Sequence, residues 1–182
     1  MAPATAAGGK VEVHWLGQAA TKLTSTTGKV IVIDPFLTNN PKTPPQFKNL
    51  DALGNVDIIL VTHGHGDHTG DVKALAERTN ATVLGPAGLI ATMVDLGWVK
   101  PDKAVRFGKG GRVNPTGPEI TITQVRAEHS SEVTVTDPAT KKSTTLPGGE
   151  PCGFIITFEN GFKLYHMGDT GLFGDLTLIG DY

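Results

Sequence analysis

Apolar residues in this chain occur in short runs that are separated by glycine, proline and polar residues. The run 56–62 is apolar and rich in β-branched residues, which predicts a buried strand. Weaker alternation of apolar and polar residues predicts three earlier strands, at 11–16, 21–26 and 29–33. The first third of the chain is therefore expected to form a sheet whose last strand is buried on both faces.

Strands and helices alternate in the middle of the chain. Residues 69–78 begin with cap-forming side chains, and residues 86–96 begin with proline and end at a glycine, so both segments predict helices. A short apolar strand is predicted between them at 81–85. This order implies parallel strands that are connected by helices. The proline-rich segment 39–55 predicts a loop with a short helix around 47–53.

The last third of the chain predicts more strands. Residues 119–128 form one long apolar pattern, and residues 152–159 and 162–166 predict a hairpin around an Asn-Gly turn. The segment 131–149 is polar and has no apolar periodicity. It is either a solvated loop or a lid over a site, and we favour the lid because the segment directly follows His129.

Composition limits the classes of protein that need to be considered. The 182 residues are expected to form one domain over 11–182 behind a flexible N-terminal segment, 1–10. A formal net charge of −2 gives no basic surface for nucleic acid, and no apolar run is long enough to span a membrane. The single Cys152 excludes an internal disulfide and predicts a buried strand residue.

The N-terminal segment bears on the compartment of the protein. Residues 1–9 are rich in alanine and lack the basic start and apolar centre of a signal peptide. A cytoplasmic location is therefore expected. A periplasmic location remains the alternative, in which a signal peptide has been replaced by the initial methionine.

The predicted strand at 56–62 leads into a group of metal-binding residue types. Three histidines and one aspartate fall within six positions in the sequence His63-Gly64-His65-Gly66-Asp67-His68. Imidazole and carboxylate groups are common ligands of zinc-like ions. In an extended segment His63 and His65 point the same way and can bind one ion, while Asp67 and His68 can serve a second ion nearby. A polar turn with exposed histidines is the alternative, which four such residues at this spacing disfavour.

Four further residues are candidates, each with a structural alternative. Asp34 ends a predicted strand, where it is either a turn residue or a partner that orients a metal-binding histidine. His129 directly follows the predicted strand at 119–128, where it is either a turn residue or a metal ligand. Asp169 is suited to cap the residues that follow it. We interpret His166 as strand packing or as a neighbour of the ligands, and not as a ligand itself.

These residues carry a resemblance to a known family. The sequence from His63 to His68 matches the His-x-His-x-Asp-His signature of the metallo-β-lactamase fold hydrolases. Further matches resemble the branch of metal-dependent hydrolases that is related to the ascorbate-6-phosphate lactonases; they lie at Trp15-Leu16-Gly17, Ile33-Asp34-Pro35-Phe36-Leu37, Thr62 to Asp71, His129-Ser130-Ser131 and His166 to Asp175. The resemblance runs from about residue 11 to the last residue and implies an α/β fold, the four-layer αββα sandwich.

The resemblance also implies a set of ligands. His63, His65 and His129 would hold the first ion, Asp67 and His68 the second, and Asp169 would bridge the two ions. Gln18 stands where many members of the family carry a histidine, so a hydrogen-bonding role near the site is expected in place of a titrating one. Members of the family continue beyond the position that matches Tyr182, with further strands, a helix and a last histidine that completes the second metal site. The second half of the sandwich is therefore expected to be incomplete here.

The expected function is metal-dependent hydrolysis. A metal-bound hydroxide would attack an ester, lactone or phosphoester, with Asp67 and Asp169 as the catalytic carboxylates. Zinc is the first expectation, and manganese, iron and nickel fit the same ligand types. The alternative is a metal-binding but inactive module, or a subunit that needs a second copy or a complementing chain. Apart from such an association, the expected partner is a small-molecule substrate.

Overall fold

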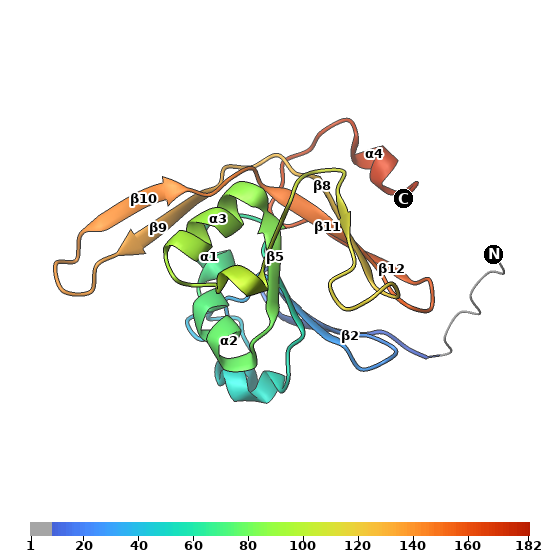
Figure 1. Ribbon diagram of the computed structural model, residues 1–182, viewed down its shortest axis with the longest axis horizontal. Helices are drawn as coiled ribbons and strands as arrows, with labels where there is room; N and C mark the ends of the chain where they lie inside the picture. Colours follow the sequence, from blue (N-terminus) through green and yellow to red (C-terminus); the bar gives the residue numbers. More distant parts are fainter. Residues whose placement is uncertain (1–8) are drawn as a thin grey trace.

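The apolar strands of the first half assemble into one six-stranded sheet in the computed structural model, which describes residues 9–182 (Figure 1). The strands follow chain order across the sheet: β1 (Glu12–Gly17), β2 (Ala20–Thr24), β3 (Val30–Ile33), β4 (Ile58–Leu60), β5 (Thr82–Pro86) and β6 (Ala104–Phe107). The first three strands pair antiparallel, and β3 to β6 are parallel. The predicted parallel arrangement with helical crossovers is therefore confirmed.

Burial on both faces explains the uninterrupted apolar sequence of β4. Ile59 and Val61 belong to the apolar cluster beneath the helices α2 (Val72–Thr79) and α3 (Ala87–Asp95). Ile58 and Leu60 point to the opposite face, where they pack in a second cluster between two sheets. Alternate residues along this strand thus pack in two different apolar cores, one on each face of the sheet, as expected for a central parallel strand.

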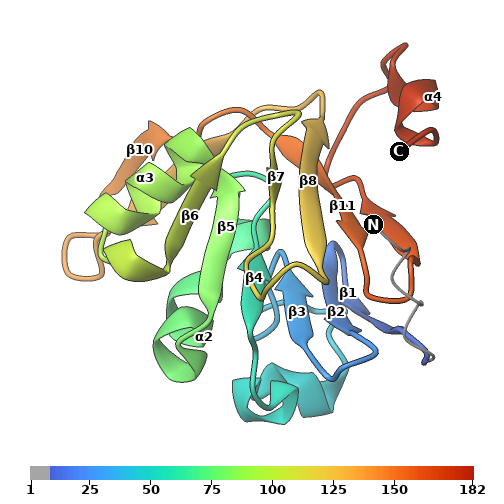
Figure 2. The ribbon, with the colours of Figure 1, turned by 45° about the vertical axis from the view of Figure 1, so that its right-hand side comes forward.

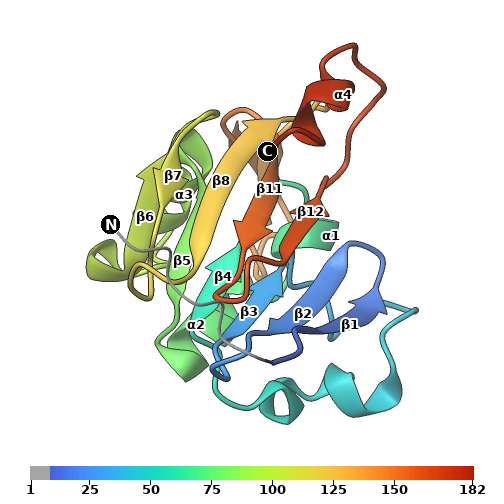
Figure 3. The ribbon, with the colours of Figure 1, turned by 90° about the vertical axis from the view of Figure 1, so that its right-hand side faces the viewer.

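The second sheet covers the face of the first that the helices leave free (Figure 2). Its strands lie in the order β12-β11-β8-β7 and are antiparallel: β7 (Arg112–Val113), β8 (Thr121–Arg126), β11 (Cys152–Thr157) and β12 (Lys163–His166). The predicted hairpin is β11–β12, and Cys152 is buried in it as expected. Strands β6 and β7 are additions that the sequence pattern did not predict. The short helix α4 (Leu176–Ile179) follows β12 near the C-terminal end of the chain (Figure 3). Its residues Leu178 and Ile179 line a pocket with Val125 and Arg126 of β8.

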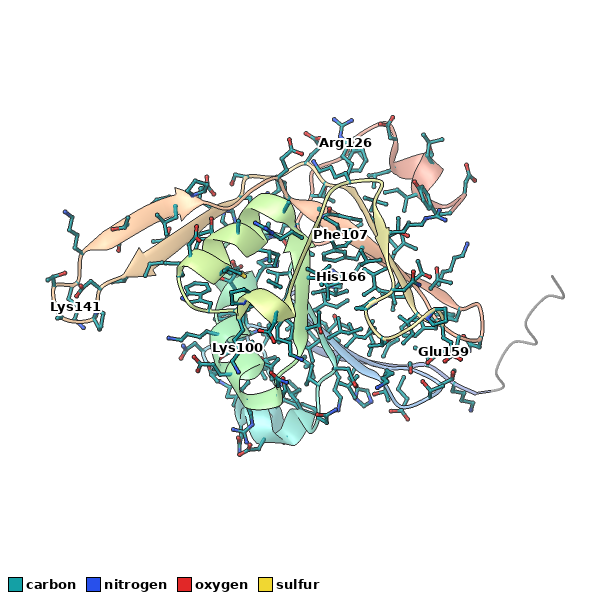
Figure 4. All side chains as sticks on the ribbon, viewed as in Figure 1. Lys100, Phe107, Arg126, Lys141, Glu159 and His166 are labelled. Carbon is teal, nitrogen blue, oxygen red and sulfur yellow. The ribbon has the colours of Figure 1, made fainter. Side chains whose placement is uncertain are left out.

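The polar segment 131–149, expected as a solvated loop or preferably as a lid, has regular secondary structure. It forms a two-stranded hairpin, β9 (Glu132–Thr136) and β10 (Ser143–Pro147), which projects from the body with Lys141 near its tip (Figure 4). The reason is that Val133 is fully buried while Val135 and Leu146 pack against the helix-side cluster. Three apolar side chains are enough to hold the base of a hairpin that is otherwise polar.

Shorter elements complete the chain. The loop over 39–55 contains two 3-10 turns, Pro45–Lys48 and Leu50–Leu53, and a third follows α3 at Pro101–Lys103. The metal-binding motif itself ends in a single helical turn, α1 (Gly66–Thr69). The predicted flexible segment 1–10 falls mostly on residues 1–8, which lie outside the described residues. Within residues 9–182, none of the helices has the length and apolar character needed to cross a membrane.

Candidate metal centre

Three strand ends bring the predicted ligands together. His63 and His65 follow β4, and His68 lies one turn later in α1. His129 follows β8 and Asp169 follows β12. Residues more than a hundred positions apart in the sequence thus meet at one edge of the two sheets.

The first group consists of His63, His65 and His129, whose ligand atoms all lie within 4.8 Å of one another. The Nε2 atom of His63 is 3.0 Å from Nδ1 of His65. His63 is fully buried, His65 is half-buried and His129 is exposed. One side of this group is therefore embedded in protein, and the other side is open to solvent.

The second group shares His63 and adds His68 and Asp169. One carboxylate oxygen of Asp169 is 3.4 Å from Nε2 of His68, and the other is 3.8 Å from Nε2 of His129. Asp169 therefore faces a histidine from each group. This is the position that a carboxylate bridging two ions would need.

Asp67 lies at the margin of the second group. Its Oδ2 atom is 4.0 Å from Nε2 of His68 and accepts a hydrogen bond of 3.0 Å from the Gln18 amide. Gln18 has a φ of 50°, which is unusual for a residue with a side chain, and its carbonyl accepts a 2.7 Å bond from the Trp15 indole. The structure thus places Gln18 in hydrogen-bond contact with the predicted ligand Asp67.

Asp34 is buried beneath the ligands and accepts three hydrogen bonds. The Thr62 amide and hydroxyl donate to it at 2.8 and 2.7 Å, and Nδ1 of His68 donates at 2.8 Å. Burial alone would raise the pKa of Asp34, but the hydrogen bond and charge of His68 and the Thr62 amide hold that pKa below its usual range. Of the two interpretations left open by the sequence, the structure supports a partner that orients a histidine.

Asp34 also determines which ring nitrogens face the centre. The single proton of the Thr62 hydroxyl is donated to Asp34, so the same oxygen must accept the proton of His63 Nδ1, which is 3.0 Å away. The Nε2 atom of His63 is then left as a lone pair that points at His65. Likewise His68 uses Nδ1 to donate to Asp34, so Nε2 is the atom that faces Asp169.

The two buried histidines differ in charge. Burial, together with the repulsion of a charged His68, lowers the pKa of His63 to about 4, so its ring is neutral near pH 7. Burial also opposes a charge on His68, but Asp34, Asp169 and Asp67 outweigh it and raise the pKa of His68. The centre therefore combines the neutral ring of His63 with the ring of His68, whose protonated form is stabilised by the carboxylates of Asp34, Asp169 and Asp67.

His166 positions the segment that carries Asp169. Its Nε2 donates to the Ala19 carbonyl at 2.9 Å, and Nδ1 accepts the Gly168 amide at 3.3 Å, which ties β12 to the first sheet (Figure 4). Gly168 has a φ of 60°, and a Cβ atom there would lie 2.8 Å from the Thr62 side chain. His166 therefore contacts the segment that carries Asp169 and lies outside the two groups of predicted ligands.

Two residues near the centre were not among the predicted ones. Glu132 at the start of β9 has a carboxylate oxygen 2.8 Å from Nε2 of His65. The Ser131 hydroxyl accepts the Gly64 amide at 3.1 Å and donates to the Gly148 carbonyl at 2.8 Å. The alternation in Glu132-Val133-Thr134-Val135-Thr136 could have revealed the strand carrying Glu132, and the interpretation of 131–149 as a segment without apolar periodicity overlooked it.

Comparison with known sequences identifies the family. The sequence model of the beta-lactamase superfamily domain matches residues 29–180. This chain belongs to the beta-lactamase superfamily. A UPF0173 metal-dependent hydrolase of Cupriavidus necator is 61% identical over 176 residues, which are 95% of this chain and 60% of that protein. The first three curated relatives are covered over 60%, 64% and 60% of their length, so the chain spans about three fifths of them.

Solved structures of the superfamily confirm the expected fold. Igni18, described as a novel metallo hydrolase from Ignicoccus hospitalis, is 29% identical, with a TM-score of 0.74 over 94% of this chain and 66% of that one. YhfI from Bacillus subtilis, described as a metallo-beta-lactamase fold protein, is 13% identical, with a TM-score of 0.63 over 94% of this chain and 68% of that one. The α/β fold inferred from the His-x-His-x-Asp-His signature is thus the observed one.

The residues of the two groups described above fit a metal ion. Because His63 Nδ1–H donates a hydrogen bond to the Thr62 hydroxyl, the other ring nitrogen, Nε2, is unprotonated. This Nε2 atom lies only 3.0 Å from Nδ1 of His65. The lone pair of His63 Nε2 is satisfied either by an N–H of His65 or by a metal ion that both nitrogens bind. The neutral imidazoles and carboxylates present are ordinary ligands of divalent transition metals.

A cavity adjoins the second group. Its volume is about 410 Å³, and Asp67, His68 and Asp169 form one wall. The rest is lined by Gln18, Ala19, Thr21 and residues 165–168. A small molecule in this cavity would contact the carboxylates directly.

Proposed function

We propose that this chain carries the dinuclear metal centre of a metal-dependent hydrolase. In this proposal His63, His65 and His129 hold the first ion, and His68 and Asp67 hold the second. The observation that carries the proposal is the position of Asp169, whose two oxygens face His68 at 3.4 Å and His129 at 3.8 Å. A carboxylate between two groups of histidine ligands is well placed to bridge two ions.

Zinc is the metal we propose first, and manganese, iron or nickel suit the same donors. Three imidazole nitrogens in the first group favour zinc-type ions over magnesium or calcium, which prefer oxygen ligands. When bound, two such ions supply Lewis acidity and an activated water for hydrolysis. The relatives that carry the name metal-dependent hydrolase support this assignment.

The protein residues have distinct tasks in this proposal. Asp34 fixes the rings of His63 and His68 with Nε2 toward the centre. Gln18 donates to one oxygen of Asp67 and leaves the other free to accept a proton from a reacting water. Asp67 and Asp169 are therefore the catalytic carboxylates, and Asp34 and His166 are positioning residues.

The cavity beside the centre supports a small-molecule substrate. A volume of about 410 Å³ accommodates a small molecule, and its polar wall suits a carbonyl or phosphoryl group with attached hydroxyls. We propose an ester, a lactone or a phosphoester. The nucleophile in this proposal is water, so a seryl or cysteinyl nucleophile is not required; Cys152, whose thiol pKa is strongly raised by burial, is unsuited to that role.

Hydrolysis by purified protein tests this proposal. Zinc-loaded protein is assayed on a panel of esters, lactones, phosphomonoesters and phosphodiesters, alongside the variants His65→Ala and Asp67→Ala. Both variants are expected to lose at least about 100-fold in kcat/KM on any substrate that is turned over. His14→Ala is the matched control, because His14 is an exposed histidine of β1 outside the centre. Equal activity of wild type and both site variants would contradict the assignment.

A second candidate keeps the metal but requires another chain for turnover. Strand β12 is the edge of the four-stranded sheet, and Phe162 and Met167 at its two ends are about half exposed. Such an edge can pair with a second copy or a complementing chain. This candidate predicts stoichiometric metal and no hydrolysis by the isolated chain, and an inactive but metal-loaded protein on the full panel would favour it.

A further inference from the structure

The β9–β10 hairpin reaches the metal centre through one side chain at its base. Glu132 is the first residue of β9, and its Oε2 is 2.8 Å from Nε2 of His65. The opposite ring nitrogen, Nδ1, faces His63 at 3.0 Å. The imidazole of His65 is therefore held between the hairpin on one side and the ligand group on the other.

We propose that Glu132 is the positioning residue of His65 and that through it the β9–β10 hairpin stabilises the first metal site. A carboxylate accepts hydrogen bonds and cannot donate them when ionised, so it requires the proton of His65 on Nε2. The Nδ1 atom is then an unprotonated ligand that points at the site. This inference rests on the proposed function, because it concerns the first ion of the proposed centre.

Contacts with the rest of the protein fix the backbone around Glu132, as this role requires. Val133, the next residue, is fully buried in the helix-side cluster. The Glu132 carbonyl packs so closely on Gly64 that a Cβ atom there would lie 2.7 Å from it. The Ser131 hydroxyl accepts the Gly64 amide at 3.1 Å. The start of β9 is thus fixed against the motif that carries His63 and His65.

One other group could compete for the same proton. The Ser130 hydroxyl is 3.3 Å from Nε2 of His65, farther away than Glu132. A hydroxyl can either donate or accept, so by itself it does not select a tautomer. Glu132, which is closer and acceptor-only, is the group that determines the ring state.

Zinc affinity measures the proposed role without any assay of activity. The affinity of wild type, Glu132→Gln and Glu132→Ala is obtained by competition with a chromogenic chelator. Loss of a partner that orients a metal-binding histidine costs about 10–100-fold in metal affinity, which is the effect expected for Glu132→Ala. Glu132→Gln retains an amide oxygen that can accept the same proton, so its affinity should lie between the other two.

Thermal unfolding separates positioning from a merely structural contribution. For each protein Tm is measured without metal and with excess zinc. Positioning by Glu132 predicts an unchanged metal-free Tm and a smaller zinc-induced rise in Glu132→Ala. Thr134→Ala is the matched control, because Thr134 is an exposed residue two positions along the same strand.

The possible outcomes distinguish this inference from the proposed function. Wild type that binds no zinc would contradict the proposed metal centre itself. If wild type, Glu132→Gln and Glu132→Ala all bind zinc with equal affinity, only the role of Glu132 would be overturned. An affinity loss of the same size in Thr134→Ala would also overturn it, because the effect would then belong to the strand and not to the carboxylate.

Discussion

Asp34 connects the two buried histidines of the centre. It is fully buried, has a φ of 47° and accepts from the Thr62 amide, the Thr62 hydroxyl and His68. Such a backbone angle is costly for a residue with a side chain and is retained where the surroundings fix it. The side chain thereby determines ring states that a metal centre depends on, without itself facing the ligand groups.

Asp34→Asn tests this role. The amide retains one accepting oxygen, so at least one buried donor of Thr62 or His68 loses its partner. The free energy of unfolding is expected to fall by about 2–4 kcal/mol, measured by urea denaturation of the metal-free protein. Asp102→Asn, at an exposed position in a 3-10 turn, serves as the control. An Asp34→Asn protein as stable as that control would contradict the account.

The two glycines of the motif are not equivalent. A Cβ atom on Gly64 would lie 2.7 Å from the Glu132 carbonyl, whereas nothing lies within 4 Å of one on Gly66. Gly64→Ala is therefore expected to displace the start of β9, destabilise the protein by about 1–3 kcal/mol and weaken zinc binding. Gly66→Ala should leave both properties nearly unchanged. Equal effects of the two substitutions, in unfolding and zinc titration, would show that the contact with Glu132 does not matter.

At the scale of elements, Glu159 joins the two sheets at the end away from the metal centre. It lies between β11 and β12, and its carboxylate accepts from hydroxyls in the turn between β2 and β3. The three hydrogen bonds, donated by the hydroxyls of Ser25, Thr26 and Thr27, are 2.7, 3.1 and 2.6 Å long. Burial alone would raise the pKa of Glu159, but the three hydroxyls lower it from 4.5 to about 2.

This contact predicts a pH dependence of stability. Because the folded-state pKa of Glu159 is depressed, its contribution is complete above the unfolded-state value near 4.5 and is lost as the pH falls toward about 2. Glu159→Gln should therefore cost about 1–2 kcal/mol at pH 6, a figure reduced for partial exposure, and the cost should shrink between pH 4.5 and 3. Urea denaturation at several pH values measures this difference.

A matched control isolates the contact of Glu159 from the general effect of removing one negative charge. Glu119→Gln changes an exposed glutamate just before β8 and should alter stability by less than about 0.5 kcal/mol at each pH. A pH-independent cost in Glu159→Gln would contradict the assigned role, since the carboxylate charge would then contribute nothing.

The elements that the sequence predicted best are those with strong local patterns. The buried run of β4, the helix α2 and the Asn-Gly hairpin β11–β12 follow from periodicity and turn residues. The β9–β10 hairpin was missed because only Val133, Val135 and Leu146 anchor it, and this anchoring depends on a distant helix-side core. Strand β7 has two residues, too few for any pattern to be visible.

At the scale of the whole molecule, the fold brings three separate segments to one edge of the sheets. The motif from His63 to His68 identified that edge from the sequence, and the resemblance supplied His129 and Asp169. The sequence predicted a hydrogen-bonding role for Gln18 near the site, but neither its partner Asp67 nor the Glu132–His65 contact, because both contacts arise only from the packing of distant segments. The roles of the ligands themselves stay predictions.

The metal content of the purified chain tests the central claim most directly. The protein is loaded with excess zinc, freed of unbound metal by gel filtration and analysed by elemental mass spectrometry, together with Asp169→Ala and the control His14→Ala. We predict about two zinc ions per chain in wild type and control, and a clear loss in Asp169→Ala. Wild type that retains no zinc, or Asp169→Ala that retains as much as wild type, would contradict a centre bridged by Asp169.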